Sequence, residues 1–453
     1  MRTFFIDFIH DRTFFGTLIK IALPIILQNL ISSSLNLIDT IMIGRVGTIE
    51  LAAVGVAAQF FFFHTVLLVG ICSGYCIFIA QAWGKRDRVT IKKYLGLALI
   101  LSLFISIVFT FTGLWKAEEI ITLFNDDAEV IRLGGIYIRT LAVSTLFTAI
   151  SFTFCHACRS IENAFLPMIA SSIALALNTF LNYVLIFGKF GMPALGVEGA
   201  ALATLIARII EASIIVGYIY LKASPLAAKP HEFDFSLAFF KRDLRTITPV
   251  VLNELCWGLA VVVYTAAYGR IDTDALASMQ VVTTIQNLFI ILGFGISGAT
   301  ATMVGNNIGR GRTEIAKTYA YRSLIICLLV GIILAVLLFI FAPLFLRLFD
   351  LDSPKVIADA VILLKILAFI LPLKLLNMTI IMGVLRAGGD VVYSLLAESC
   401  VMWFVGVPLA FIGAVVWKLP VILVFALVAM EDVVKIFCCV YRVISGKWVH
   451  TLV

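Results

Sequence analysis

Long apolar segments alternate with short polar segments along the whole chain. About 20 consecutive, mostly apolar residues are enough to cross a bilayer as a helix, and twelve segments of this kind are predicted. The longest polar break, at 223–241, separates a first set of six (1–222) from a second set of six (242–453). The pattern predicts an all-α polytopic membrane protein with two six-helix lobes joined by a linker. The twelve predicted spans lie near residues 17–43, 52–83, 92–115, 133–156, 165–187, 195–222, 243–269, 276–308, 316–341, 357–383, 391–417 and 420–443.

The two predicted lobes repeat each other at a constant offset of 225 positions. Six spans per lobe is an even number, so both lobes enter the membrane in the same orientation. We therefore expect a pseudo-two-fold axis along the membrane normal, with a cavity between the lobes. The aligned pairs include Pro24 and Pro249, Thr40 and Thr265, Gly44-Arg45 and Gly269-Arg270, Gly70 and Gly295, and Tyr94 and Tyr319.

The composition excludes a soluble globular protein. Hydrophobic residues make up 62% of the chain and charged residues only 13%, whereas soluble domains have about 25% charged residues. Lysine and arginine gather in alternate connections, such as 85–93 and 310–322. The positive-inside rule places these connections, the linker and both termini in the cytoplasm. We expect a multi-pass protein of the inner (cytoplasmic) membrane, without a cleaved signal peptide and, despite the net charge of +7, without a nucleic-acid partner.

Asp39 is an ionisable side chain inside the first predicted span, fifteen residues after Pro24. A carboxylate is costly at that depth, so it indicates a functional site. Asn36 lies three residues earlier on the same helical face. A carboxylate beside amide oxygens can bind Na⁺ transiently or accept a proton; the alternative is a structural ion pair with Arg45. Pro24 removes a backbone hydrogen-bond donor and is the predicted hinge of this helix.

Polar residues in three further spans extend this hypothesis. Asn178 and Asn182 are four residues apart in the fifth span, so both amides can reach one site or bond neighbouring helices. Thr204 in the sixth span can add a hydroxyl oxygen.

The second lobe carries Glu254, five residues after Pro249. It is interpreted as a second cation site, a contact for a cationic substrate, or an acid that reaches the membrane surface. Gln286 and Asn287 in the eighth span are polar enough to line a cavity.

The sequence shows no recognisable pattern of catalytic residues. The five histidines are dispersed without an HExxH motif, and no GxxxxGK[ST] loop is present. Most of the nine cysteines lie in apolar spans and are expected to pack as small residues; the lone Cys155-x-x-Cys158 pair is a weak metal or redox signal. We therefore expect neither catalysis nor a resident metal or cofactor, other than a coupling ion. A channel is a further alternative to a transporter, but a channel would not need one isolated acid beneath a proline bend.

Several segments, in order, resemble the multidrug and toxic compound extrusion (MATE) family, and the resemblance covers nearly the whole chain. They are Pro24 through Asp39-Thr-Ile-Met-Ile-Gly44-Arg45; Asn178 to Asn182 followed by Gly191-Met-Pro-Ala-Leu-Gly196-Val-Glu-Gly199; Pro249-Val-Val-Leu-Asn-Glu254; and Leu385-Arg386-Ala-Gly-Gly-Asp390.

The resemblance implies an antiporter that exports small amphipathic or cationic compounds through the bilayer by alternating access, in exchange for H⁺ or Na⁺. We expect the protein to be a monomer. It also implies a cation-coupling site of Asp39, Asn178, Asn182 and Thr204. Some members have an aspartate at the position of Asn182. Others pair the glutamate matched by Glu254 with an acid in the tenth span, but none occurs here between residues 361 and 383. The rival interpretation is a lipid-linked oligosaccharide flippase of the same wider superfamily, which would favour a strongly basic cavity.

Overall fold

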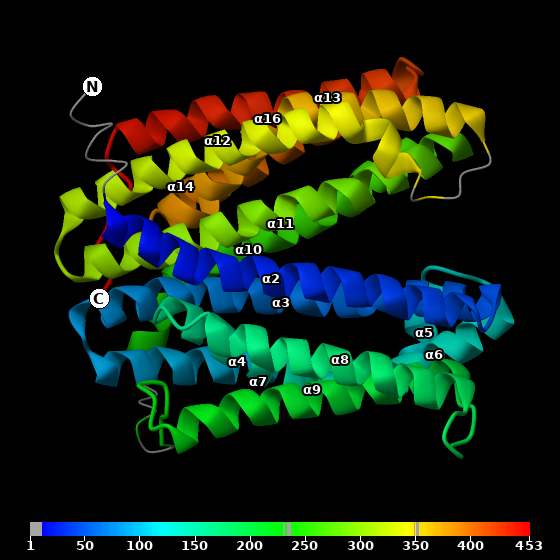
Figure 1. The fold of residues 1–453 in the computed structure, drawn as a ribbon, viewed down its shortest axis with the longest axis horizontal. Helices are drawn as coiled ribbons and strands as arrows, with labels where there is room; N and C mark the ends of the chain where they lie inside the picture. The colour runs from blue at the N-terminus through cyan, green and yellow to red at the C-terminus, as the bar shows by residue number, and fades with distance from the viewer. Residues whose placement is uncertain (1–10, 230–231, 233–236, 348, 350–352) are drawn as a thin grey trace. The chain divides into compact units, whose positions relative to one another are not determined.

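The computed structural model describes residues 11–229, 232, 237–347, 349 and 353–453 (Figure 1). Long helices dominate these residues, and no named strand occurs among them. The first half of the chain contains α2 (Arg12–Gly44), α3 (Thr48–Lys85), α4 (Arg88–Trp115), α5 (Ala117–Thr122), α6 (Ala128–Ala142), α7 (Ser144–Ser160), α8 (Phe165–Phe187) and α9 (Gly196–Leu221).

The second half contains regular helices and several π-helical segments. The regular helices are α10 (Leu237–Gly269), α11 (Thr273–Gly309), α12 (Thr313–Leu346), α13 (Pro354–Met378) and α16 (Val421–Ile444). α13 continues as the π-helix η2 (Thr379–Arg386). The next span alternates between α14 (Val391–Leu395), η3 (Leu396–Cys400), η4 (Met402–Gly406), α15 (Val407–Phe411) and η5 (Ile412–Val416). Short π-helical segments are frequent at functional sites.

Every predicted span coincides with a helix or a bent helix pair. In the described part of the chain, ten helices are long and apolar enough to cross a membrane, and α6 with α7 forms an eleventh candidate. α16 occupies the twelfth predicted span but carries Glu431, Asp432 and Lys435 among its apolar residues.

The fourth span is not the single straight helix predicted at 133–156. Its two parts, α6 and α7, meet at an angle of 50°. The hydroxyl of Thr145 donates a 2.7 Å hydrogen bond to the carbonyl of Ala142, and the hydroxyl of Thr110 lies 3.2 Å from the same carbonyl. Side-chain donors that satisfy a backbone carbonyl allow a helix to bend at that point.

Packing divides the chain into two compact units at places that differ from the predicted lobe boundaries. One unit consists of Leu27–Ile247, and the other combines the chain up to Ile26 with Thr248–Val453. α2 and α10 therefore each contribute to both units. We call residues 12–26 of α2 the first arm and residues 237–247 of α10 the second arm.

Each arm packs on helices from the other half of the sequence. The first arm contacts α12, and the second arm contacts α3 and α4. In the first arm, the ring of Phe14 lies 5.0 Å from that of Tyr319 on α12, and Asp11, the residue before the arm, pairs with Arg322. In the second arm, Ile247 packs against Gly74 of α3, and Arg242 donates a 3.3 Å hydrogen bond to the hydroxyl of Tyr94. Buried apolar and ring contacts of this kind explain the exchange of the arms.

The chain's last residues cover the loop at 385–390. Trp448 is fully buried, and a Cβ atom at Gly388 would lie only 2.4 Å from the Trp448 side chain. The His450 N–H donates a 2.7 Å hydrogen bond to the Gly388 carbonyl, while Gly389 adopts φ +86°, which favours glycine. Glycine at 388 is therefore required by the close approach of the tryptophan.

Replacing Gly388 with alanine should destabilise the protein by about 1–3 kcal/mol, because the added methyl group overpacks the Trp448 contact. The measurement is the midpoint of thermal unfolding in detergent. Gly217→Ala in α9 is the matched control, since no atom lies within 4 Å of the added Cβ. Equal midpoints for the two variants would contradict this account of the loop.

Candidate functional site

Asp39 is held by two asparagines of α8, within the unit Leu27–Ile247. Asn182 Nδ2 donates a 2.7 Å hydrogen bond to Asp39 Oδ1. In the amide orientation that satisfies both of its polar atoms, Asn178 places its nitrogen 2.9 Å from Asp39 Oδ2. Both asparagines are buried, and Asp39 is partly buried. The carboxylate therefore bonds neutral amides rather than forming the alternative ion pair with Arg45.

Thr204 joins this group from α9. Its hydroxyl oxygen lies 3.2 Å from the amide oxygen of Asn178 in the same orientation. α9 approaches α8 closely because residue 199 is glycine, where a Cβ atom would lie 2.6 Å from the carbonyl oxygen of Leu185. The structure thus brings together Asp39, Asn178, Asn182 and Thr204, which we call the Asp39 site; their role in ion binding stays a prediction.

The donor set of the Asp39 site is suited to a proton or a small monovalent cation. It offers one carboxylate, two amides and a hydroxyl, and hard cations such as Na⁺ prefer oxygen ligands. The amide oxygen of Asn182 is buried and accepts no hydrogen bond, so one oxygen atom is available to a ligand. Among the described residues, no group of three or more His, Cys, Asp or Glu side chains is arranged to hold a metal ion.

Tyr137 of α6 is a neighbour of the Asp39 site that the sequence did not indicate. It packs against Ile43, Ile186 and Ala200, which flank the site on α2, α8 and α9. It is also close enough to interact electrostatically with the Asp39 carboxylate. A tyrosine inside an apolar helix is common, so its spacing alone carried no signal.

Glu254 lies in the other unit and is paired with a cation of the protein itself. Its Oε1 accepts a 2.6 Å hydrogen bond from Nη1 of Arg386, and both side chains are buried. The same guanidinium reaches Glu398 at 3.4 Å, and Asn253 Nδ2 donates a 2.6 Å hydrogen bond to Glu398. Glu254 therefore does not extend to the membrane surface.

Arg386 is a buried arginine whose partners the sequence did not indicate. It is the last residue of η2 and is only 4% exposed. A buried arginine requires compensating carboxylates, and Glu254 and Glu398 supply them from α10 and η3. Only the tertiary structure brings these three charges together.

The remaining predicted residues are Gln286, Asn287, Asn36 and Pro24. Gln286 and Asn287 lie on α11, where Gln286 is partly exposed and Asn287 is exposed. Both belong to the unit that does not contain Asp39. The side chain of Asn36 lies outside the described part of the structure. Pro24 lies inside the continuous helix α2, three residues before the chain passes from one packing unit to the other.

A second cluster of buried charged side chains lies on α16, and the sequence did not indicate a function for it. Glu431 accepts hydrogen bonds from the hydroxyl of Tyr264 and from Lys435, while Asp432 lies 3.2 Å from Lys374 of α13. At the 225-residue offset, Tyr264 is the counterpart of Asp39. The available signal was the presence of four charged residues in one otherwise apolar span.

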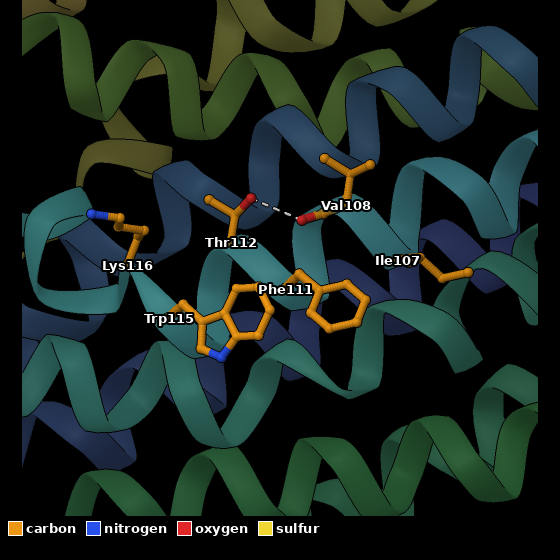
Figure 2. Close-up of a pocket in the computed structure, with 6 residues that line it drawn as sticks. All are labelled: Ile107, Val108, Phe111, Thr112, Trp115 and Lys116. Atoms are coloured by element: carbon orange, nitrogen blue, oxygen red, sulfur yellow. Dashed lines mark hydrogen bonds between the residues drawn. The ribbon is translucent and has the colours of Figure 1, made fainter.

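Figure 2 shows a hollow on the surface of α4 and the residue after it. Its lining is mostly apolar, and its hydroxyl, that of Thr112, bonds the carbonyl of Val108 at 2.8 Å. Trp115 is 75% exposed there, as is typical of a tryptophan at a membrane–water interface. None of the predicted site residues lines this hollow, which we interpret as lipid-facing. Its lining consists of Ile107, Val108, Phe111, Thr112, Trp115 and Lys116.

Comparisons with known proteins agree on one family. The MatE family model matches residues 24–184 and again residues 249–412. The two matches begin 225 positions apart, which confirms the repeat predicted from the sequence. A probable multidrug resistance protein NorM of Thermotoga maritima is 25% identical over 433 residues, covering 95% of this chain and 92% of the relative. The probable multidrug resistance protein YoeA of Bacillus subtilis is 26% identical over 413 residues, covering 88% and 87%.

Solved structures share the fold. A MOP superfamily transporter from Pyrococcus furiosus superposes with a TM-score of 0.87 and 22% identity, covering 95% of this chain and 96% of the other. A MATE structure in the straight conformation gives 0.86 at the same identity and coverage. These likenesses confirm the predicted fold class, and the relatives are transporters rather than enzymes. The chain therefore belongs to the MatE family, the multidrug and toxic compound extrusion transporters that its motifs resemble.

Proposed function

We propose that this protein is a secondary antiporter that exports small amphipathic or cationic compounds in exchange for H⁺ or Na⁺. The Asp39 site takes up the coupling ion, and no other cofactor is needed. The observation that carries the proposal is a partly buried carboxylate, within a predicted span, that is bonded by neutral amides beside an amide oxygen without a partner. Such a carboxylate is neutralised by a proton or a cation, and its charge then changes as the ion arrives and leaves.

The names of the relatives support the proposed substrates. NorM of Thermotoga maritima and YoeA of Bacillus subtilis are both described as probable multidrug resistance proteins. The Asp39 carboxylate, which is bonded by neutral amides rather than by a cation, also favours cations over the pyrophosphate group of a lipid-linked oligosaccharide, which would need a strongly basic cavity. The protein acts as a monomer in the lipid bilayer of the inner membrane. The charge distribution of its connections supports cytoplasmic termini.

Pro24 is the proposed hinge of the transport cycle. α2 passes from one packing unit to the other immediately after this proline, and a proline removes the hydrogen bond that would stiffen the helix there. Ion binding at Asp39, fifteen residues further along α2, can bias the helix between two shapes. The equilibrium shifts only as far as the ion binds the two shapes differently.

Replacing Asp39 with asparagine should abolish the dependence of efflux on the ion gradient, because the charge that binds the ion is lost. The measurement is efflux of a lipophilic cation from proteoliposomes under an imposed Na⁺ gradient and, separately, an imposed H⁺ gradient. The gradient that drives efflux in the wild type identifies the coupling ion. Asp126→Asn, which changes an exposed aspartate of the same unit, serves as the control. Unaltered coupling in Asp39→Asn would refute the assignment.

Replacing Asn182 with leucine should raise the half-saturating concentration of the coupling ion by about tenfold, a loss of about 1.4 kcal/mol. The change removes both the donor to Asp39 and the unpartnered oxygen while keeping a similar side-chain volume. Ion titration of efflux provides the measurement. Thr204→Val, which removes only a hydroxyl at the edge of the site, should have a smaller effect; the reverse order would contradict the proposed ligand set.

Replacing Pro24 with alanine should slow efflux several-fold and leave the half-saturating ion concentration within twofold of the wild-type value. The added backbone hydrogen bond stiffens α2, whereas the Asp39 site is unchanged. Initial efflux rates at saturating ion measure the effect. Pro343→Ala, in the interior of α12, is the matched control, and equal rates for the wild type and both variants would exclude a hinge at Pro24.

A further inference from the structure

Asp243, in the second arm, is a buried acid that accepts no hydrogen bond. It is 1% exposed, and neither carboxylate oxygen has a hydrogen-bond partner. The nearest cation is its neighbour in sequence, Arg242, whose Nε lies 3.6 Å from Asp243 Oδ1 and whose side chain is 59% exposed. An ionised carboxylate in such a place is compensated only by this largely exposed guanidinium, without the hydrogen bonds that buried charges also require.

The surroundings of Asp243 are aromatic and apolar. Ile247, one turn later on the same face, packs on Gly74 of α3. The groups that face the carboxylate closely enough for electrostatic interaction are Arg242 on its own helix, Tyr75 on α3 and Tyr94 on α4. The Tyr75 hydroxyl is also buried, and it neither donates nor accepts a hydrogen bond. Lys92 of α4 is bonded to Glu232 at 2.7 Å.

The other buried acids of the described residues all accept a side-chain hydrogen bond, Asp432 from Asn377 at 3.3 Å. Glu211 accepts from Ser171 and Arg208, at 2.6 and 2.7 Å. Asp390 accepts from Arg442 at 2.6 Å, and the acids at 254, 431 and 432 have the partners described above. Asp243 is therefore an exception within its own protein.

The first arm offers an internal comparison. The acid that directly precedes it, Asp11, pairs with Arg322 of α12, and the guanidinium also lies 5.8 Å from the centre of the Phe14 ring. At the 225-residue offset, the counterpart of Arg322 is Leu97 on α4, which is buried. The helix that receives the second arm therefore has a leucine where the helix that receives the first arm has an arginine.

We propose that Asp243 is a proton-binding site distinct from the Asp39 site, protonated while the second arm packs on α3 and α4. When the arm separates from these helices, the carboxyl group meets water and releases its proton to solvent. Packing of the arm and binding of one proton are then thermodynamically linked, so a rise in pH weakens the packing. The proposal does not depend on Asp39 being the coupling site.

Infrared spectroscopy tests the protonation directly. A protonated carboxyl group absorbs above the amide I band, in a region free of ionised carboxylates, and the absorption shifts in D₂O. In the purified wild-type protein at pH 7.5 we expect a carbonyl component that Asp243→Asn lacks. Asp11→Asn, the paired acid of the other arm, and Asp39→Asn should both retain it. A spectrum of Asp243→Asn identical to that of the wild type would overturn the proposal.

Hydrogen exchange tests the link to packing. In the wild type, peptides from 240–250 should lose protection several-fold between pH 6 and pH 9 after correction for the chemical exchange rate, whereas peptides from 12–26 should not. In Asp243→Asn the second arm should show no such change, while Asp39→Asn should behave as the wild type even if Asp39 is not the coupling residue. The comparison of the two arms within the wild type remains decisive should the variant fail to fold. Equal pH responses of both arms would overturn the proposal.

Discussion

The low polarity of the membrane interior is the constraint on which the rest of this structure depends. A charge placed there must be compensated by a partner, by hydrogen bonds or by an ion from solution. Partners and hydrogen bonds are both present among the described residues. Arg386 neutralises Glu254 within the unit that ends the chain, whereas Asp39 is bonded only by neutral amides. A carboxylate without its own cation is the kind of group that can exchange an ion during a transport cycle.

The two halves of the repeat distribute their charges differently although they share one fold. The position of Asp39 is occupied in the second half by Tyr264, whose hydroxyl bonds Glu431 on α16. Lys435, one turn away, donates to the same carboxylate, so a fixed ammonium group compensates the acid there. A glycine at 406 leaves room for this contact, because a Cβ atom would lie 2.1 Å from the Tyr264 hydroxyl. The duplication therefore preserved the helices and not the chemistry.

The two arms also differ in their charged contacts, and this difference bears on how the chain can move. Each long first helix has its two ends in different packing units, so any change in its shape acts on both. The first arm is joined by an ion pair between Asp11 and Arg322, while the second contains Asp243, which accepts no hydrogen bond and lies 3.6 Å from the exposed Arg242. A hydrogen-bonded ion pair stays charged over a wide pH range, whereas a buried acid that accepts no hydrogen bond is more sensitive to the proton concentration. The two contacts thus differ in what can weaken them.

The sequence alone determined the membrane class, the helix positions, the repeat and the family, because a run of apolar residues long enough to span a bilayer is a strong local signal. It also indicated Asp39, since an acid inside such a run is conspicuous. It did not indicate Tyr137, the partners of Arg386, or the missing hydrogen bonds of Asp243. Those properties depend on which helices lie side by side. The exchange of the arms also became visible only in the tertiary structure, because spacing along one helix specifies a face but not the neighbour that the face contacts.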